Sequence, residues 1–177
     1  MKCFVLLFFF CISKISSQSY IIGDSQSFLL AKNCQNAKIY PSLAKSGIGI
    51  KDLIKMLQNS EIDPNAKNIF ISIGVNDAYS DFGIENLVNN LFTTFPNAFF
   101  YIVKGSYGWG KVANISPGSS NYSNYYIKFK KSGVYVLKNL TIGFGDPHVD
   151  KPQYIQLGKY MDYIIYKSEE FHRKLTH

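Results

Sequence analysis

A serine stands at the point where the first apolar run after residue 19 stops. Residues 20–28 read YIIGDSQSF, in which the apolar run ends at Gly23 and is followed by Asp24 and Ser25. Two interpretations suit this pattern. In the first, Asp and Ser cap a helix and Gly makes the turn before it. In the second, Ser25 is a nucleophile at the end of a strand. Residues elsewhere in the chain bear on the choice.

Three further polar stretches could complete a site for acyl transfer, which needs a nucleophile, a base and hydrogen-bond donors for an oxyanion. Gly47 lies in KSGIGIKDL, Asn76 lies in GVND, and GDPHVD contains Asp146 and His148. His148 could take the proton from Ser25. The backbone N–H groups of Ser25 and Gly47 and the side-chain amide of Asn76 could bind the oxyanion.

The elements that position these residues alternate between apolar strands and amphipathic helices. The segment 50–59, for example, places its apolar residues three and four apart, as a helix with one buried face does. Strands are expected at 19–23, 37–41, 68–74, 97–105 and 134–139, and helices at 25–33, 50–59, 84–95, 121–133 and 151–171. Apolar strands separated by helices predict a parallel sheet covered on both faces.

The predicted fold class is therefore α/β: a three-layer α/β/α sandwich with a flavodoxin-like, parallel, five-stranded sheet. Right-handed crossovers bring the carboxyl ends of all the strands to one edge of such a sheet. Ligands bind at this edge in open α/β folds. The four polar stretches follow strand ends, so we expect them to meet there.

With these residues in this order, the chain resembles the SGNH (GDSL-type) hydrolases, a family of esterases and lipases named for Ser, Gly, Asn and His in four blocks. GDSQS at 23–27 is similar to the first block and SGIGIKDL at 46–53 to the second. GVND at 74–77 matches the G-x-N-D pattern of the third, and DPHVDKPQYIQLG at 146–158 is similar to the last. The resemblance covers nearly all of the chain after residue 19 and implies the SGNH hydrolase fold and a carboxylic ester hydrolase activity.

The resemblance also implies a role for each candidate residue. Ser25 would be the nucleophile and His148 the general base, while Ser25, Gly47 and Asn76 would form the oxyanion hole. One departure concerns the third member of the triad. The family usually has Asp three residues before its His, whereas here Asp146 lies two residues before His148. Asp146 could still orient the imidazole through a tighter turn, or a backbone carbonyl or Asp150 could do so.

The first residues resemble a secretory signal peptide. They read MKCFVLLFFFCISKISSQ, with an apolar run at 3–12 that is too short to span a bilayer as a helix. We expect a signal peptide at 1–18, a single SGNH hydrolase-like domain at 19–177, and a secreted or extracytoplasmic protein with no stable membrane span once the signal is removed. An uncleaved anchor is the competing interpretation. Cys34 would be the one cysteine left, so no intramolecular disulfide would form.

Composition bears on partners and cofactors. The net charge is +7, but the lysines are scattered and no nucleic-acid motif is present, so no nucleic-acid partner is expected. No His, Cys or acidic cluster has the spacing of metal ligands. We therefore expect neither a metal nor another cofactor.

The segment between the fourth and fifth expected strands bears on the substrate. Tyr107 and Trp109 lie in it, and aromatic side chains near the site could stack on sugar rings or line an acyl groove. The alternative is a surface loop held down by its own aromatics. Because the chain has no large lid insertion, we favour a short acyl ester, such as an O-acetyl group, on a carbohydrate or lipid.

Three other functions suit parts of the sequence. The chain could be a catalytically weak SGNH-fold module that binds a glycan or another ligand, which the shifted Asp146 would explain. It could hold a nucleotide on a flavodoxin-like sheet, although both common glycine-rich phosphate motifs are missing. It could also be a surface module that binds a protein partner.

Overall fold

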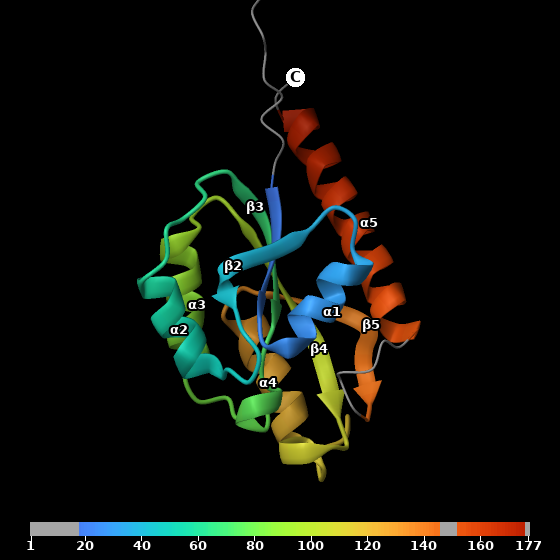
Figure 1. Ribbon diagram of the computed structural model, residues 1–177. Helices are drawn as coiled ribbons and strands as arrows, with labels where there is room; N and C mark the ends of the chain where they lie inside the picture. Colours follow the sequence, from blue (N-terminus) through green and yellow to red (C-terminus); the bar gives the residue numbers. More distant parts are fainter. Residues whose placement is uncertain (1–17, 146–151, 176–177) are drawn as a thin grey trace, which may run out of the picture.

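The computed structural model describes residues 18–145 and 152–175, apart from the side chains of residues 138, 139 and 172–175. Strands and helices alternate along this part of the chain (Figure 1). In order, the elements are β1 (Gln18–Gly23), α1 (Ser25–Asn33), β2 (Lys38–Ala44), α2 (Ile50–Gln58), β3 (Ala66–Ser72), α3 (Ile84–Thr94), β4 (Phe99–Tyr107), α4 (Ser120–Lys131), β5 (Tyr135–Phe144) and α5 (Pro152–Leu175). Short 3₁₀ turns at Val75–Asp77 and Gly110–Val112 follow β3 and β4.

The strands form a parallel five-stranded sheet in the order β2-β1-β3-β4-β5. Tyr20 of β1 lies opposite Ile69 of β3, which in turn lies opposite Phe100 of β4. Helices α1 and α5 cover one face, and α2, α3 and α4 cover the other (Figure 1). The predicted α/β/α sandwich with a flavodoxin-like strand order is therefore confirmed.

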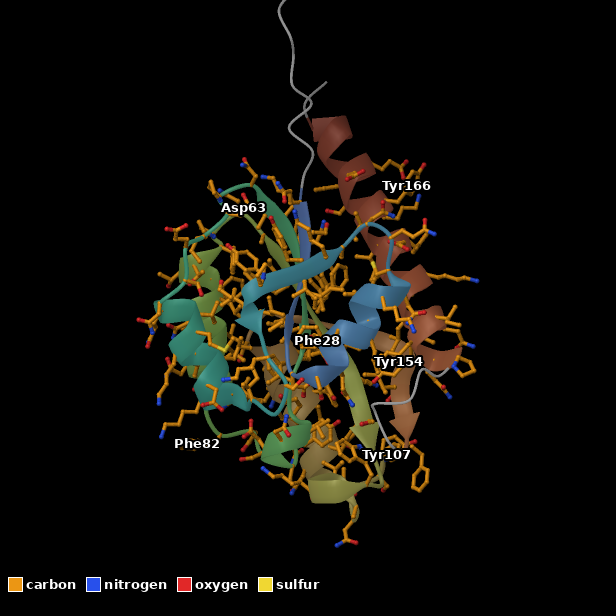
Figure 2. The ribbon with its side chains drawn as sticks, viewed as in Figure 1. Phe28, Asp63, Phe82, Tyr107, Tyr154 and Tyr166 are labelled. Carbon is orange, nitrogen blue, oxygen red and sulfur yellow. The ribbon has the colours of Figure 1, made fainter. Side chains whose placement is uncertain are left out.

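Two apolar cores lie on the two faces of the sheet. Along β1 and β3 the side chains alternate between them: Ile22 and Ile71 face α2 and α3, whereas Ile21 and Phe70 face α1 and α5. Both faces of these strands are buried, so their sequences read as unbroken apolar runs rather than as an alternation of apolar and polar residues. Tyr154, from the first turn of α5, is fully buried between that helix and the sheet (Figure 2).

Helix α5 lies close against the carboxyl end of α1. A Cβ at Gly158 would stand 1.9 Å from the Asn33 carbonyl oxygen, so a larger residue would push the two helices apart. The Asp162 carboxylate accepts hydrogen bonds from the backbone N–H groups of Gln35 (3.1 Å) and Asn36 (2.8 Å) and from the Cys34 thiol (3.2 Å). Burial opposes the charge of this carboxylate, but the hydrogen bonds outweigh it and lower the pKa of Asp162.

Asp162→Asn is expected to lower the free energy of unfolding by about 1 to 2 kcal/mol, because hydrogen bonds to a charged acceptor are replaced by weaker ones. Urea unfolding at neutral pH measures the change. Asp81→Asn, at an exposed carboxylate, is the matched control and should stay within about 0.5 kcal/mol of the original protein. Equal stability of the two variants would show that the Asp162 contacts contribute nothing.

Candidate active site at the carboxyl edge of the sheet

Ser25 is the first residue of α1 and directly follows the turn that ends β1. The turn depends on Gly23, which has φ = +124° and whose Cβ, if present, would lie 1.9 Å from the Ser72 carbonyl oxygen. The Asp24 N–H donates to the same carbonyl oxygen at 2.8 Å, which ties the turn to the end of β3. Ser25 itself is half-buried, so its side chain stands at a helix N-terminus within reach of solvent.

Asp24 has the structural role that the N-cap interpretation expects. Its Oδ1 accepts from the Gln26 N–H at 3.0 Å, and its carbonyl oxygen accepts from the Ser27 hydroxyl. The residue is only 1% exposed, and its Oδ2 has no hydrogen-bond partner among the described residues. Burial, with a smaller contribution from Asp77, raises the pKa of Asp24 from the ordinary 3.8 to about 7. The cap interpretation and the nucleophile interpretation are therefore compatible, because they concern neighbouring residues.

The raised pKa of Asp24 predicts a specific pH dependence of stability. Between about pH 4 and about pH 7 the unfolded chain has lost this proton while the folded chain keeps it, so stability falls as pH rises. Relative to Asp24→Asn, which keeps a capping oxygen, the original protein should lose up to about 4 kcal/mol across this window. Urea unfolding at several pH values tests this, with Asp81→Asn expected to follow the original protein. A constant difference between Asp24→Asn and the original protein would contradict the prediction.

The loop that follows β2 is joined to the turns after β1 and β3. The Lys45 N–H donates to the Gly23 carbonyl oxygen at 2.9 Å, and the Ile50 N–H donates to Oδ2 of Asp77 at 2.7 Å. Gly49 allows the second contact, because a Cβ there would lie 2.2 Å from Oδ1 of Asp77. Asp77 therefore holds two loops together, as a structural carboxylate would.

Asn76 and Gly47 belong to the same pair of loops. Nδ2 of Asn76 donates to the Ile48 carbonyl oxygen at 2.9 Å, which uses one of its two amide hydrogens and leaves the other for a ligand. Gly47 is exposed, has φ = +80°, and has open space around the position of its missing Cβ. In the part of the chain that the structure describes, no group accepts a hydrogen bond from its N–H. Two of the three expected oxyanion donors thus belong to loops that are hydrogen-bonded to each other.

The sequence analysis did not identify three buried residues next to this edge of the sheet: Gln26, Tyr79 and Ser106. Tyr79 is 1% exposed, and its hydroxyl donates to the Ser106 carbonyl oxygen at 2.6 Å. Its φ of +56° is a strained value for a bulky residue. The hydroxyl of Ser106 accepts from Nε2 of Gln26 at 2.5 Å and from Nε1 of Trp109 at 2.8 Å. The helix that begins at Ser25 is therefore tied to the end of β4.

Tyr107 and Trp109 are both half-buried. Tyr107, at the end of β4 (Figure 2), packs against the rings of Tyr122 and Phe144 at centroid distances of 5.8 and 6.2 Å. Trp109 turns its indole N–H inward to Ser106. The aromatics thus hold the segment after β4 against the molecule, and a contact of either residue with substrate stays a prediction.

Asp146, His148 and Asp150 lie outside the described residues. The strand before them ends at Phe144, which lies opposite Tyr107 of β4, and the Gly145 N–H donates to the Tyr107 carbonyl oxygen at 2.9 Å. Because the sheet is parallel, this end of β5 is at the same edge as Ser25 and Asn76. The assignment of a base and of an orienting carboxylate stays a prediction.

Two further chemistries can be compared with the described residues. Burial raises the pKa of the Cys34 thiol to about 12, with a contribution from Asp162, so this thiol stays protonated and is a poor nucleophile at neutral pH. No group of three or more His, Cys, Asp or Glu residues within 18–145 and 152–175 is placed to hold a metal ion.

The helices can also be compared with membrane-spanning segments. Within 18–145 and 152–175, none combines the length and the apolar character that a membrane span requires.

Comparison with known proteins bears on the fold. No family model matches the chain, and no curated protein matches it. A solved structure from Desulfitobacterium hafniense DCB-2, described as "a putative lipolytic protein of G-D-S-L family", superposes with a TM-score of 0.52 and 12% sequence identity, over 84% of this chain and 99% of that one. The chain therefore has the SGNH/GDSL-type hydrolase fold, as the resemblance of its motifs implied.

Proposed function

We propose that the chain is a serine ester hydrolase that cleaves acyl esters at the carboxyl edge of its sheet. One observation carries the proposal: on a GDSL-type fold, hydrogen bonds join the three turns that bear Ser25, Gly47 and Asn76. These are the residue types that a nucleophile and its oxyanion hole require. His148 and Asp146 enter the proposal from their place in the sequence motif.

The mechanism follows the serine hydrolase pattern. Oγ of Ser25 attacks the carbonyl carbon of the ester, and its proton passes to His148. The negative charge that develops on the carbonyl oxygen is bound by the N–H groups of Ser25 and Gly47 and by Nδ2 of Asn76. The tetrahedral intermediate then collapses, and the alcohol leaves with the proton from His148. Water, activated by His148, next attacks the acyl-enzyme and releases the acid and free Ser25.

The substrate class is proposed from the loops at this edge. One residue, Asp24, separates β1 from α1, and the loop between β2 and α2 covers only residues 45–49. These two loops supply little to enclose a long chain, whereas the connections after β3 and β4 are longer, at residues 73–83 and 108–119. Because the chain has no large lid insertion, we favour a short acyl group. An O-acetyl group on a carbohydrate is our first choice, and a lipid ester is the second. A secreted location, with residues 1–18 removed, belongs to the proposal; an intact N-terminus on exported protein would contradict it.

The test combines turnover with active-site labelling. The purified protein is assayed on p-nitrophenyl acetate, butyrate and octanoate and on acetylated xylan, and it is then treated with a fluorophosphonate. We expect faster turnover of acetate than of octanoate and one phosphonyl group attached through Oγ of Ser25, with loss of fluoride, as located by peptide mass mapping. A folded protein with neither turnover nor label would reject the ester hydrolase and favour the alternative, a catalytically weak module that binds a glycan or another ligand.

A further inference from the structure

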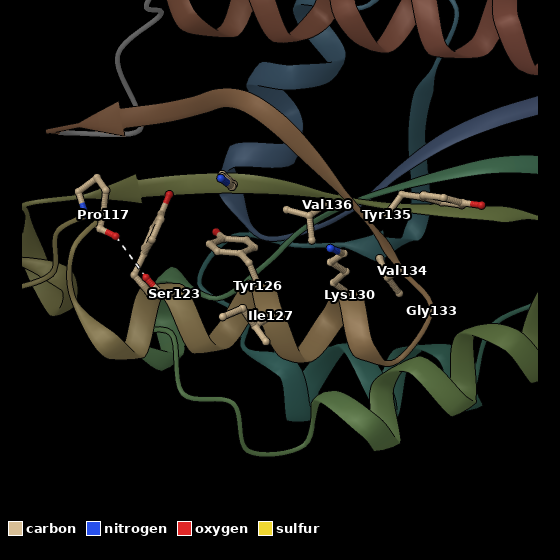
Figure 3. Close-up of a pocket in the computed structure, with 11 residues that line it drawn as sticks. Pro117, Ser123, Tyr126, Ile127, Lys130, Gly133, Val134, Tyr135 and Val136 are labelled. Atoms are coloured by element: carbon tan, nitrogen blue, oxygen red, sulfur yellow. Dashed lines mark hydrogen bonds between the residues drawn. The ribbon is translucent and has the colours of Figure 1, made fainter.

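An apolar groove lies between α4 and the edge strand β5, and Ser25, Gly47 and Asn76 are not among the residues that line it. Its volume is about 760 Å³, within the range of pockets that bind small molecules. Tyr126 and Ile127 of α4 line one side, and Val134 and Val136 line the other (Figure 3). We call this feature the α4–β5 groove.

The groove lies beside an irregularity in the sheet. Ile102 of β4 pairs with Val136 of β5, but the next recorded pair joins Lys104 with Thr141. Strand β4 thus advances two residues while β5 advances five, and the register of the edge strand is broken. Lys104 and Val136, which flank this break, both line the groove.

A hydrogen bond holds the inner side of the groove wall, and the outer side is in contact with solvent. The hydroxyl of Tyr126 accepts from the Gly105 N–H at 2.8 Å, and Tyr126 is only 5% exposed. Ile127 of α4 is 48% exposed, and Val136 of β5 is half-buried. Large apolar side chains thus line the groove and are still in contact with solvent, so a ligand that covered them would remove apolar surface from water.

The charged side chains that line the groove are both positive. Lys104 and Lys130 line it, and among the described residues no acidic side chain does. Lys104 is half-buried, and in the described part of the chain neither lysine has an ion-pair or side-chain hydrogen-bond partner. Lys130 points from α4 toward the sheet, beside Val134 and Val136 (Figure 3). Unpaired ammonium groups on an apolar wall complement a molecule with a hydrocarbon chain and one anionic end.

We propose that the α4–β5 groove binds the carboxylate form of a free fatty acid. The alkyl chain lies along Ile127, Val134 and Val136, and the carboxylate accepts hydrogen bonds from Lys104 and Lys130. The site is separate from the proposed catalytic centre and does not depend on it. Binding is therefore expected in Ser25→Ala as in the original protein.

Isothermal titration calorimetry with decanoate, below its critical micelle concentration, is the first experiment. We expect saturable binding of one decanoate, and a Kd about three- to fourfold weaker for each methylene removed in nonanoate and octanoate. Decanol and decyltrimethylammonium, which have the chain without the negative charge, should bind at least about tenfold more weakly. Equal binding of decanoate and decyltrimethylammonium would overturn the proposed role of the lysines.

Matched variants locate the site. Lys104→Gln with Lys130→Gln is expected to weaken decanoate binding at least about tenfold, whereas Lys159→Gln, an exposed lysine of α5, should leave it unchanged. Ile127→Asp should abolish binding, and Ile155→Asp, an equally exposed isoleucine on α5 (46%), should not. Circular dichroism and the activity on p-nitrophenyl acetate confirm that each variant is folded.

Two outcomes would overturn the proposal. The first is decanoate binding that none of the groove variants changes. The second is binding that fluorophosphonate labelling of Ser25 abolishes, which would place the fatty acid in the catalytic centre. Loss of esterase activity in Ser25→Ala with decanoate binding intact would support both proposals independently.

Discussion

Replacing Ser25 with alanine is expected to lower kcat/KM for p-nitrophenyl acetate at least about 10⁴-fold, because the acyl-enzyme can no longer form. His148→Ala should have an effect of similar size. In the proposed mechanism the two residues act as a unit, so the double variant should be little worse than either single variant. The remaining rate would come from the oxyanion donors and from binding, which neither change removes.

The controls for these variants are a serine and a histidine outside the site. Ser120 is exposed at the start of α4, and His172 lies in the polar C-terminal part of the chain. Ser120→Ala should keep activity within about twofold, as surface substitutions usually do. His172→Ala, in a polar stretch outside the sequence motifs, is expected to do the same. Activity that survives Ser25→Ala would remove this residue as the nucleophile, even if the chain proved to be an esterase by another route.

Asn76→Ala has the second-largest expected effect. It should lower kcat about 100- to 1,000-fold with little change in KM, since in the proposed mechanism the lost hydrogen bond forms to the oxyanion and not to the ground state. The same change removes the hydrogen bond to the Ile48 carbonyl oxygen, so some loss of stability is expected as well. Steady-state kinetics and urea unfolding on the same preparation separate the two effects.

Asn90 offers a matched control for Asn76. It is also half-buried, and its amide donates to the Asn86 carbonyl oxygen at 2.8 Å, yet it lies on α3. Asn90→Ala should lower the free energy of unfolding by about 1 kcal/mol without lowering kcat. If both variants lost stability equally and both kept kcat, Asn76 would be a loop-holding residue alone.

Helices whose ends are marked by a capping residue or a glycine could be predicted from the sequence. Helix α1 begins at Ser25 and ends at Asn33, as the sequence analysis expects. Asp24, directly before Ser25, caps the helix and fixes its start. Helix α4 ends at Lys131, and Ser132 is its C-cap. Gly133 follows with φ = +92°, as expected for a glycine that terminates a helix. Such signals act within a few residues and can be read directly from the chain.

Strand β5 was predicted to stop at residue 139, but it continues to Phe144. The expectation followed the apolar run, which ends at Leu137. The rest of the strand pairs with β4 after the register break, and Thr141 adds a side-chain hydrogen bond to the Gly105 carbonyl oxygen at 3.1 Å. That pairing depends on a neighbouring strand about 36 residues away, and no local pattern encodes it.

The candidate site was predictable in part for the same reason. Ser25, Gly47 and Asn76 follow strand ends, and a parallel sheet brings strand ends to one edge. The link between Gln26 and Ser106 spans 80 positions and joins two residue types with no special pattern around them. The left-handed backbone of Tyr79 is equally hidden, since a bulky residue is an unexpected choice at positive φ. A Ser at the end of an apolar strand is the one signal that could have drawn attention to Ser106.

The hydrogen bonds between the three turns have a consequence for amide hydrogen exchange. The N–H groups of Asp24, Lys45 and Ile50 lie outside the strands, yet each donates within 2.9 Å to a neighbouring turn or strand end. Their exchange should require the same opening events that release the central strands, and not the rapid local openings typical of surface loops. The proposed oxyanion donors are then organised when the chain folds, and binding of an ester does not have to order them.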